Sequence, residues 1–328
     1  MRVCIVGAGA IGSVIGARLA HAGQAQVSAV TRGETLEALR HHGWRMRAQG
    51  KTITGPVHAS ASAQDLGPQD VVFLTVKAPA LGTVAQSLPP LLTPSTIVVP
   101  AMNGVPWWFC QGVPQLDKIH FQSIDPRADI GKRIPVENVL GCVLHASARR
   151  IEPGLVEETM WHNLLIGEPF GGMSVRTGKI ADLLSQAGCI AASSADIRSE
   201  IWYKLWGNMT MNPVSAITGA TIDRILDDPL VRAFCSAAMR EAAHVGEQIG
   251  CPIKQSPDDR HEATARLGAF KTSMLQDAEA GRELELDAIV GVVHEIALHL
   301  DIATPNIDAL LGMTRLFARV RGLYPTDR

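Results

Sequence analysis

The chain has 328 residues, 46% of them hydrophobic and 19% charged, so it can bury a sizeable core and is expected to form two domains of unequal size. Its 30 basic and 32 acidic side chains give a formal net charge of −2, and no basic run is interleaved with aromatic residues, which argues against nucleic-acid binding. No apolar run is long enough to cross a membrane.

The cysteines and the N-terminus indicate a reducing compartment. The cysteines are scattered, at Cys4, Cys110, Cys142, Cys189, Cys235 and Cys251, with no C-x-x-C pair and no histidines at zinc-ligand spacing. We therefore expect reduced, mostly buried thiols and neither a disulfide framework nor a metal site. The first residues enter a predicted strand without the pattern of a signal peptide, which favours a cytoplasmic protein.

The first predicted strand, residues 2–6, runs into the glycine-rich stretch GAGAIG, and residues 13–23 then show apolar residues at helical spacing. Strand, glycine turn and helix is the arrangement that binds a dinucleotide. The residues expected to contact such a cofactor here are Gly7, Gly9, Ala10, Ile11 and Gly12.

Each glycine of this stretch has a separate physical reason. Gly7 allows the tight turn, Gly9 lets a pyrophosphate approach the backbone, and Gly12 lets the helix pack closely on the strand. The free N–H groups at the start of the helix favour an anion. The alternative is a glycine-rich turn without a ligand.

The second predicted strand, residues 25–31, is followed by Arg32. NAD-binding sites usually carry Asp or Glu about 20 residues after the glycines, where it accepts from the ribose 2′-hydroxyl. A guanidinium at that place can bind a 2′-phosphate instead, so the sequence favours NADPH over NADH. The alternative is that Arg32 is a solvated turn residue.

Two further predicted strands, residues 70–76 and 95–100, are continuous apolar runs of the kind buried in parallel sheets. Lys77 follows the first and Asn103 the second. Ligands gather at the carboxyl ends of strands in such sheets, so we expect both side chains at a site for cofactor or substrate. Taken alone, each could be a surface lysine or a turn asparagine.

Residues 107–135 form a proline-punctuated loop that begins with Trp107, Trp108 and Phe109. We expect these aromatic side chains to pack on the sheet, with a lid or wall over the site as the alternative. Residues 136–159 and 163–169 then predict antiparallel strands that finish the same sheet, with a turn at Pro153.

From about Asp196 the pattern becomes helical. Asp196 is the candidate N-cap. The side chains expected to pack are those of Ile201, Leu205, Met209 and Ile217.

The same helix carries a polar row, Lys204, Asn208 and Asn212, at the four-residue spacing that stacks side chains on one face. Buried lysine and amide groups are costly unless they have partners, which favours a site over packing. Pro213 predicts a kink beside the two amides, and the sequence does not decide whether it shapes the site.

Two more helices are predicted over residues 266–281 and 283–300. Ser273 lies on the first, and Glu285 opens the second. Helical periodicity does not select one acidic residue in this region, and the competing carboxylates are Asp277, Glu283 and Asp287.

These motifs closely resemble the ketopantoate reductase family, the NADPH-dependent 2-dehydropantoate 2-reductases of pantothenate and coenzyme A biosynthesis. The resemblance covers essentially the whole chain. It rests on GAGAIG, on VKA at 76–78, on NG at 103–104, on KLWGNMTMNP at 204–213 and on KTSMLQDAEAGRELELDAI at 271–289.

The resemblance implies an α/β Rossmann domain, residues 1–194, followed by an all-α domain, residues 195–328, like that of 6-phosphogluconate dehydrogenase. The active site would lie in the cleft between them. The implied cofactor is NADP(H), and the implied partner is a small 2-oxo acid. Apolar surface on the helical domain leaves a homodimer open.

Carried onto this sequence, the family pattern makes Lys204 the general acid and Glu285 the group that orients substrate and lysine. The implied substrate-binding residues are Asn103, Asn208, Asn212, Ser273 and Glu285. Lys77 and Asn103 are implied cofactor contacts, and Arg32 matches the family's contact with the 2′-phosphate.

Three functions remain open at this point. The first is reduction of a 2-oxo acid, with ketopantoate the best single expectation, although the aromatic loop at 107–135 is longer than in compact members of the family. The second is a related hydride transfer by a β-hydroxyacid dehydrogenase or an imine reductase. The β-hydroxyacid enzymes resemble one another in a K-x-x-N helix, one residue shorter than the motif here. The third is an NADPH sensor without turnover, which would not need Lys204 as a proton donor.

Overall fold

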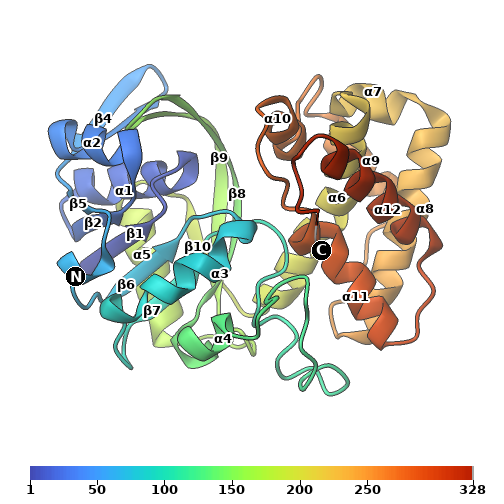
Figure 1. Cartoon of the computed structure of the whole chain (residues 1–328), viewed down its shortest axis with the longest axis horizontal. Helices are drawn as coiled ribbons and strands as arrows, with labels where there is room; N and C mark the ends of the chain where they lie inside the picture. Colours follow the sequence, from blue (N-terminus) through green and yellow to red (C-terminus); the bar gives the residue numbers. More distant parts are fainter. Residues whose placement is uncertain (327–328) are drawn as a thin grey trace. The chain divides into compact units, whose positions relative to one another are not determined.

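The computed structural model describes residues 1–326, which form two compact units (Figure 1). The first comprises residues 1–102 and 127–198, and the second comprises residues 103–126 and the chain from Ser199 onward. We predicted from the sequence that residues 103–126 belong to the first domain, whereas in the structure they belong to the helical unit.

The first unit is built around a parallel sheet of five strands in the order β5-β2-β1-β6-β7. The strands are β1 (Arg2–Val6), β2 (Gln26–Val30), β5 (His58–Ser60), β6 (Val71–Leu74) and β7 (Ile97–Pro100). The helices of this unit are α1 (Ala10–Ala22), α2 (Gly33–His42), α3 (Ala78–Ser87), α4 (Ile130–Arg133) and α5 (Val175–Gln186). The four apolar runs predicted as strands are confirmed, and the two that precede Lys77 and Asn103 are neighbours, as β6 pairs with β7.

A second sheet contains the remaining strands of this unit, in the order β10-β9-β3-β4, with β8 paired to β9. They are β3 (Trp44–Ala48), β4 (Lys51–Gly55), β8 (Gly141–Glu152), β9 (Leu155–Gly167) and β10 (Ala191–Ser194). The antiparallel pair and its turn after Glu152 are confirmed. The expectation that this pair finishes the first sheet was wrong, because β9 pairs with β3 and β10 instead.

Helix α1 contacts strands of both sheets. A side chain added at Gly12 would lie 2.3 Å from the carbonyl oxygen of Gly7, and one added at Gly16 would lie 2.6 Å from the ring of Trp44 on β3. A helix covered on two sides must be apolar or small nearly all round. This explains why α1 buries eight of its residues and lacks a clear polar face.

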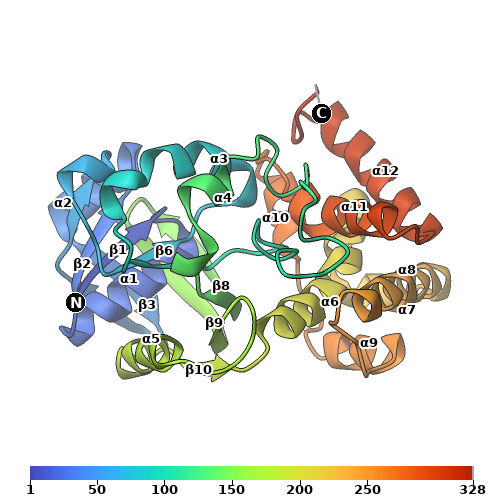
Figure 2. The same cartoon turned by 90° about the horizontal axis from the view of Figure 1, so that it is seen from below.

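The second unit is helical, and no strand is assigned to its described residues (Figure 2). Its elements are α6 (Ile197–Thr218), α7 (Ile222–Asp227), α8 (Pro229–Gln248), α9 (Pro257–Ala265), α10 (Ser273–Glu279), the π-helix η4 (Asp287–Gly291), α11 (Val292–His299) and α12 (Pro305–Val320). Within residues 1–326, no helix combines the length and the apolar character needed to cross a bilayer.

Helix α6 is the longest helix described and runs through Pro213. The indole N–H groups of Trp202 and Trp206 donate to carbonyl oxygens of α8, at 3.2 Å and 2.7 Å respectively. Trp202 also stacks on Phe109, with ring centroids 6.0 Å apart. The expectation that Phe109 packs on the sheet was therefore wrong, because its partner is a tryptophan of the helical unit.

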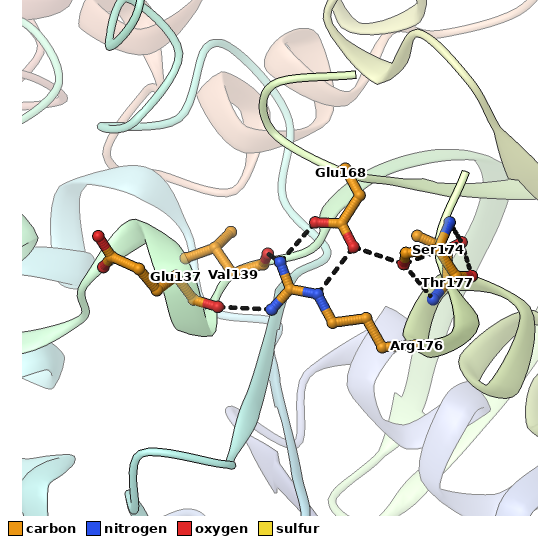
Figure 3. A network of polar contacts seen from close by, with 6 residues as sticks. All are labelled: Glu137, Val139, Glu168, Ser174, Arg176 and Thr177. Atoms are coloured by element: carbon orange, nitrogen blue, oxygen red, sulfur yellow. Dashed lines mark hydrogen bonds and ion pairs between the residues drawn. The ribbon is translucent and has the colours of Figure 1, made fainter. Parts of the chain in front are cut away.

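The end of β9 is tied to the start of α5 by an ion pair between Glu168 and Arg176 (Figure 3). Arg176 Nε donates to Glu168 at 2.8 Å, and Ser174 donates to the same carboxylate at 2.5 Å. Arg176 also donates to the carbonyl oxygens of Glu137 and Val139. The hydrogen bond from Arg176 is the largest cause that lowers the pKa of Glu168 below its ordinary value.

A lowered pKa means that Glu168 stabilises the fold above the ordinary carboxyl pKa of 4.5 and loses this effect as the pH falls through its folded value. We expect Glu168→Gln to reduce the free energy of unfolding by about 2 kcal/mol at neutral pH. The difference from the unchanged protein should shrink in acid, as measured by denaturant unfolding at several pH values. Glu157→Gln, which removes a more exposed pair with Arg149, should have a much smaller effect, and equal losses would contradict the prediction.

Candidate active site

The glycine turn has the geometry that a dinucleotide phosphate requires. Gly7 has a φ of 97°, which side chains rarely allow, and a side chain added at Gly9 would meet no atom within 4 Å. Helix α1 follows directly, with no side-chain cap and no acidic residue in its first turn. The N–H groups of Ala10 and Ile11 stand at its free positive end. The residues therefore fit an anionic cofactor.

Arg32 and Lys77 follow the strands on either side of β1. Arg32 comes two residues after β2 at the N-cap position of α2 and is exposed. Lys77 comes three residues after β6 at the N-cap position of α3 and is half-buried. Since β2, β1 and β6 are parallel neighbours, both residues lie at the same edge of the sheet as the glycine turn. The predicted positions of Arg32 and Lys77 after these two strands are confirmed, and their contact with a cofactor stays a prediction.

In the second unit, Lys204 and Asn103 are in direct contact. Lys204 lies on α6, and its Nζ donates to Oδ1 of Asn103 at 2.8 Å. The residues are 101 positions apart in the chain. Because an ammonium group has three donors and no acceptor, this contact engages one N–H and directs the amide oxygen, and not the amide nitrogen, toward Lys204.

Asn103 is held in place by the π-helix η4. Gly104 has a φ of 82°, and a side chain there would lie 2.5 Å from the carbonyl oxygen of Ala288. The N–H of Val105 donates to that same oxygen at 2.8 Å. π-helical turns are rare and are often found at functional sites. Here the turn fixes the backbone on which Asn103 stands.

The other end of the segment 103–126 is attached to α11. The carboxylate of Glu295 accepts from the backbone N–H groups of Gln122 and Ser123, at 2.7 Å and 2.9 Å. Phe121 lies edge-on to His299, with ring centroids 5.5 Å apart. Trp107, Trp108 and Phe109 are buried. The segment is thus anchored at both ends in the helical unit.

The remaining amides and the serine are placed on helices of the same unit. Asn208 is half-buried and Asn212 is only 6% exposed, one and two turns after Lys204 on α6. Ser273 is the exposed first residue of α10. Within residues 1–326, the side chains of these three residues form no hydrogen bond, so their polar groups can serve a ligand.

The helices around Ser273 and Glu285 are shorter than predicted. α10 begins at Ser273 and not near residue 266, because Thr272 caps it by accepting from the N–H of Leu275. The second predicted helix does not begin at residue 283, since Glu285 directly precedes the helical residues and η4 forms their first turn. A π-helical turn has no signature in the apolar periodicity on which that prediction rested.

The structure separates the competing carboxylates. Asp277 is buried and forms an ion pair with Arg282 at 2.9 Å. Asp287 accepts from the hydroxyl of Tyr324 at 2.6 Å. Glu283 is exposed, whereas Glu285 is half-buried. Sequence reasoning missed Tyr324 and Glu295, for which no spacing or motif provided a signal.

The buried cysteines agree with the predicted thiols, since all six are buried and none forms a disulfide. Burial raises the pKa of Cys189 and of Cys235 to about 12, so both thiols stay protonated at neutral pH.

Comparison with known proteins identifies the family. Residues 3–170 match the family model described as ketopantoate reductase PanE/ApbA, and residues 196–318 match its C-terminal counterpart. The chain is 41% identical to a 2-dehydropantoate 2-reductase of Mesorhizobium japonicum, over 99% of this chain and 100% of that protein.

Solved structures show the same relationship. A crystal structure assigned as a ketopantoate reductase from Ralstonia solanacearum is 52% identical, covers 98% of this chain and 99% of its own, and superimposes with a TM-score of 0.93. A 2-dehydropantoate 2-reductase from Methylococcus capsulatus is 25% identical with a TM-score of 0.84, over 98% of both chains. The chain belongs to the ketopantoate reductase family of oxidoreductases.

Proposed function

We propose that this protein reduces a 2-oxo acid to the 2-hydroxy acid with NADPH, and that its substrate is 2-dehydropantoate. The family membership and the relative from Mesorhizobium japonicum, which is named for this reaction, support the substrate class. The observation that carries the chemistry is the contact between Lys204 and Asn103, which orients an ammonium group on the helix that also carries Asn208 and Asn212.

Lys204 is the general acid of this proposal. As a hydride adds to the ketone carbon, negative charge develops on the ketone oxygen and must be stabilised and then protonated. Asn103 orients the ammonium group of Lys204, and in the proposal Lys204 donates an N–H to the ketone oxygen. The oxygen takes the proton from Lys204, and the product is a neutral hydroxyl group.

The other polar residues orient the substrate. In the proposal, Asn208 and Asn212 donate to the substrate from the same face of α6, and Ser273 donates to its carboxylate. Glu285 keeps the ammonium of Lys204 charged, since a nearby carboxylate favours the charged form of a lysine. Each of these roles is open to test by single substitution.

The cofactor belongs to the first unit in this proposal. The bound nicotinamide supplies the hydride when it is in its reduced form. Gly9 leaves the backbone room for the pyrophosphate, while Gly7 allows the turn and Gly12 the close packing of α1. Arg32 binds the 2′-phosphate that distinguishes NADPH from NADH.

The test is NADPH oxidation by the full chain with a panel of 2-oxo acids, led by 2-dehydropantoate and including other branched and aromatic ones. We expect turnover, with the highest kcat/KM for 2-dehydropantoate. A higher kcat/KM for another 2-oxo acid of the panel would contradict 2-dehydropantoate as the substrate but would still support the reduction of a 2-oxo acid. Tight NADPH binding without turnover of any of them would refute the enzyme and favour a sensor.

A further inference from the structure

We infer that Tyr324 is a positioning residue for Glu285, and that the C-terminal segment Leu323–Tyr324 is the clasp that holds Glu285 in its working position. This inference rests on the proposed function. The clasp forms hydrogen bonds with the chain on both sides of Glu285. The N–H of Leu284 donates to the carbonyl oxygen of Leu323 at 3.0 Å, and the hydroxyl of Tyr324 donates to Asp287 at 2.6 Å.

The stretch that carries Glu285 needs external support. Residues 282–285 have no regular secondary structure, and the turn that follows is the π-helix η4. Irregular backbone lacks the ladder of hydrogen bonds that fixes a helix or strand, and π-helical turns are uncommon alternatives to the α-helix. Contacts from elsewhere therefore help to fix the backbone at Glu285.

The clasp itself is rigid because the end of α12 is closed by a Schellman motif. The N–H of Leu323 donates to Ala318 at 2.7 Å, and that of Gly322 donates to Arg319 at 3.0 Å. The guanidinium of Arg319 also lies over the ring of Tyr324, 5.6 Å from its centroid. These contacts hold Tyr324 in place independently of its hydrogen bond to Asp287.

Burial limits the freedom of the whole arrangement. Leu284 is 1% exposed, Leu286 is fully buried, and Tyr324 is 7% exposed. Glu285 stands between two buried leucines and remains half-buried itself. With its neighbours fixed in this way, the backbone at Glu285 can shift only if the contacts of Leu284 or of Asp287 are lost.

The contact between Tyr324 and Asp287 also separates the roles of two carboxylates. A hydroxyl that donates to a carboxylate forms a charge-assisted hydrogen bond, which engages Asp287 on the side of the clasp. Glu285, two residues away, is then the acidic group that the clasp positions for Lys204.

The test is Tyr324→Phe, which removes the hydroxyl and keeps the ring against Arg319. We expect amide hydrogen exchange of residues 284–291 to quicken several-fold, and kcat/KM for the 2-oxo acid to fall about tenfold, as for a lost charge-assisted hydrogen bond. The Kd of NADPH should not change. Tyr203→Phe removes the other tyrosine hydroxyl of the chain, which contacts Gln255 and Arg260, and should leave exchange at 284–291 unchanged.

A double-mutant cycle decides whether Tyr324 acts through Glu285. If it does, Tyr324→Phe should cost almost no further activity in a Glu285→Gln background. The inference would be overturned if the losses in kcat/KM of the two single variants multiplied in the double mutant. It would also be overturned if amide exchange at 284–291 in Tyr324→Phe matched that of the unchanged protein. Failure of the unchanged protein to turn over any 2-oxo acid would refute the proposed function. The exchange measurement would still show whether the clasp holds residues 284–291 in place.

Discussion

Lys204→Ala is expected to lower kcat for 2-oxo acid reduction by about a hundredfold to ten-thousandfold, the usual contribution of a positioned general acid. The variant keeps the glycine turn and Arg32, so the Kd of NADPH should stay within about twofold of its original value, since neither of the proposed phosphate contacts is altered. Steady-state kinetics and a separate NADPH titration measure the two effects.

The matched control is Lys254→Ala, which removes an exposed lysine of the same helical unit and should leave kcat unchanged. The kcat of Asn103→Ala should lie between those of the two lysine variants, because Lys204 keeps its charge but loses its contact with the amide oxygen of Asn103. Unchanged turnover in Lys204→Ala would refute the assigned acid. A parallel loss of NADPH binding would instead indicate damage to the fold.

Much of the first unit was predictable because its signals are local. The buried runs of β6 and β7, the glycine turn and the position of Arg32 each depend on a few consecutive residues. The second sheet was not predictable in the same way. β3 carries two arginines in five residues, and β3 is joined to β9 by pairing over more than 100 positions.

The candidate site shows the same division. The four-residue spacing placed Lys204, Asn208 and Asn212 on α6 correctly, since helical periodicity is a local rule. No such rule relates Lys204 to Asn103, or Asp287 to Tyr324. These contacts depend on a π-helical turn and on packing between distant segments, which apolar patterns do not encode.

In the proposed function, the choice between NADPH and NADH depends on the guanidinium of Arg32. Arg32→Ala should weaken NADPH binding roughly ten- to a hundredfold, the range for a lost charge-assisted contact with the 2′-phosphate, and should change NADH binding little. Titration of both nucleotides with each variant measures this. Arg32→Glu should weaken NADPH binding more than Arg32→Ala does, since a carboxylate repels the phosphate. It should also strengthen NADH binding, since a carboxylate can accept from the 2′-hydroxyl of NADH.

Ionic strength provides an independent check of the same contact. Arg32 is exposed, so its attraction for a phosphate is screened by salt. The affinity for NADPH should therefore fall with added salt more steeply in the unchanged protein than in Arg32→Ala. Arg150→Ala, which removes an exposed arginine of β8, should keep the original preference. Equal losses of NADPH and NADH affinity in Arg32→Ala would show that Arg32 supports the adenosine site in general, and NADPH selectivity would then have to come from another residue of the first unit.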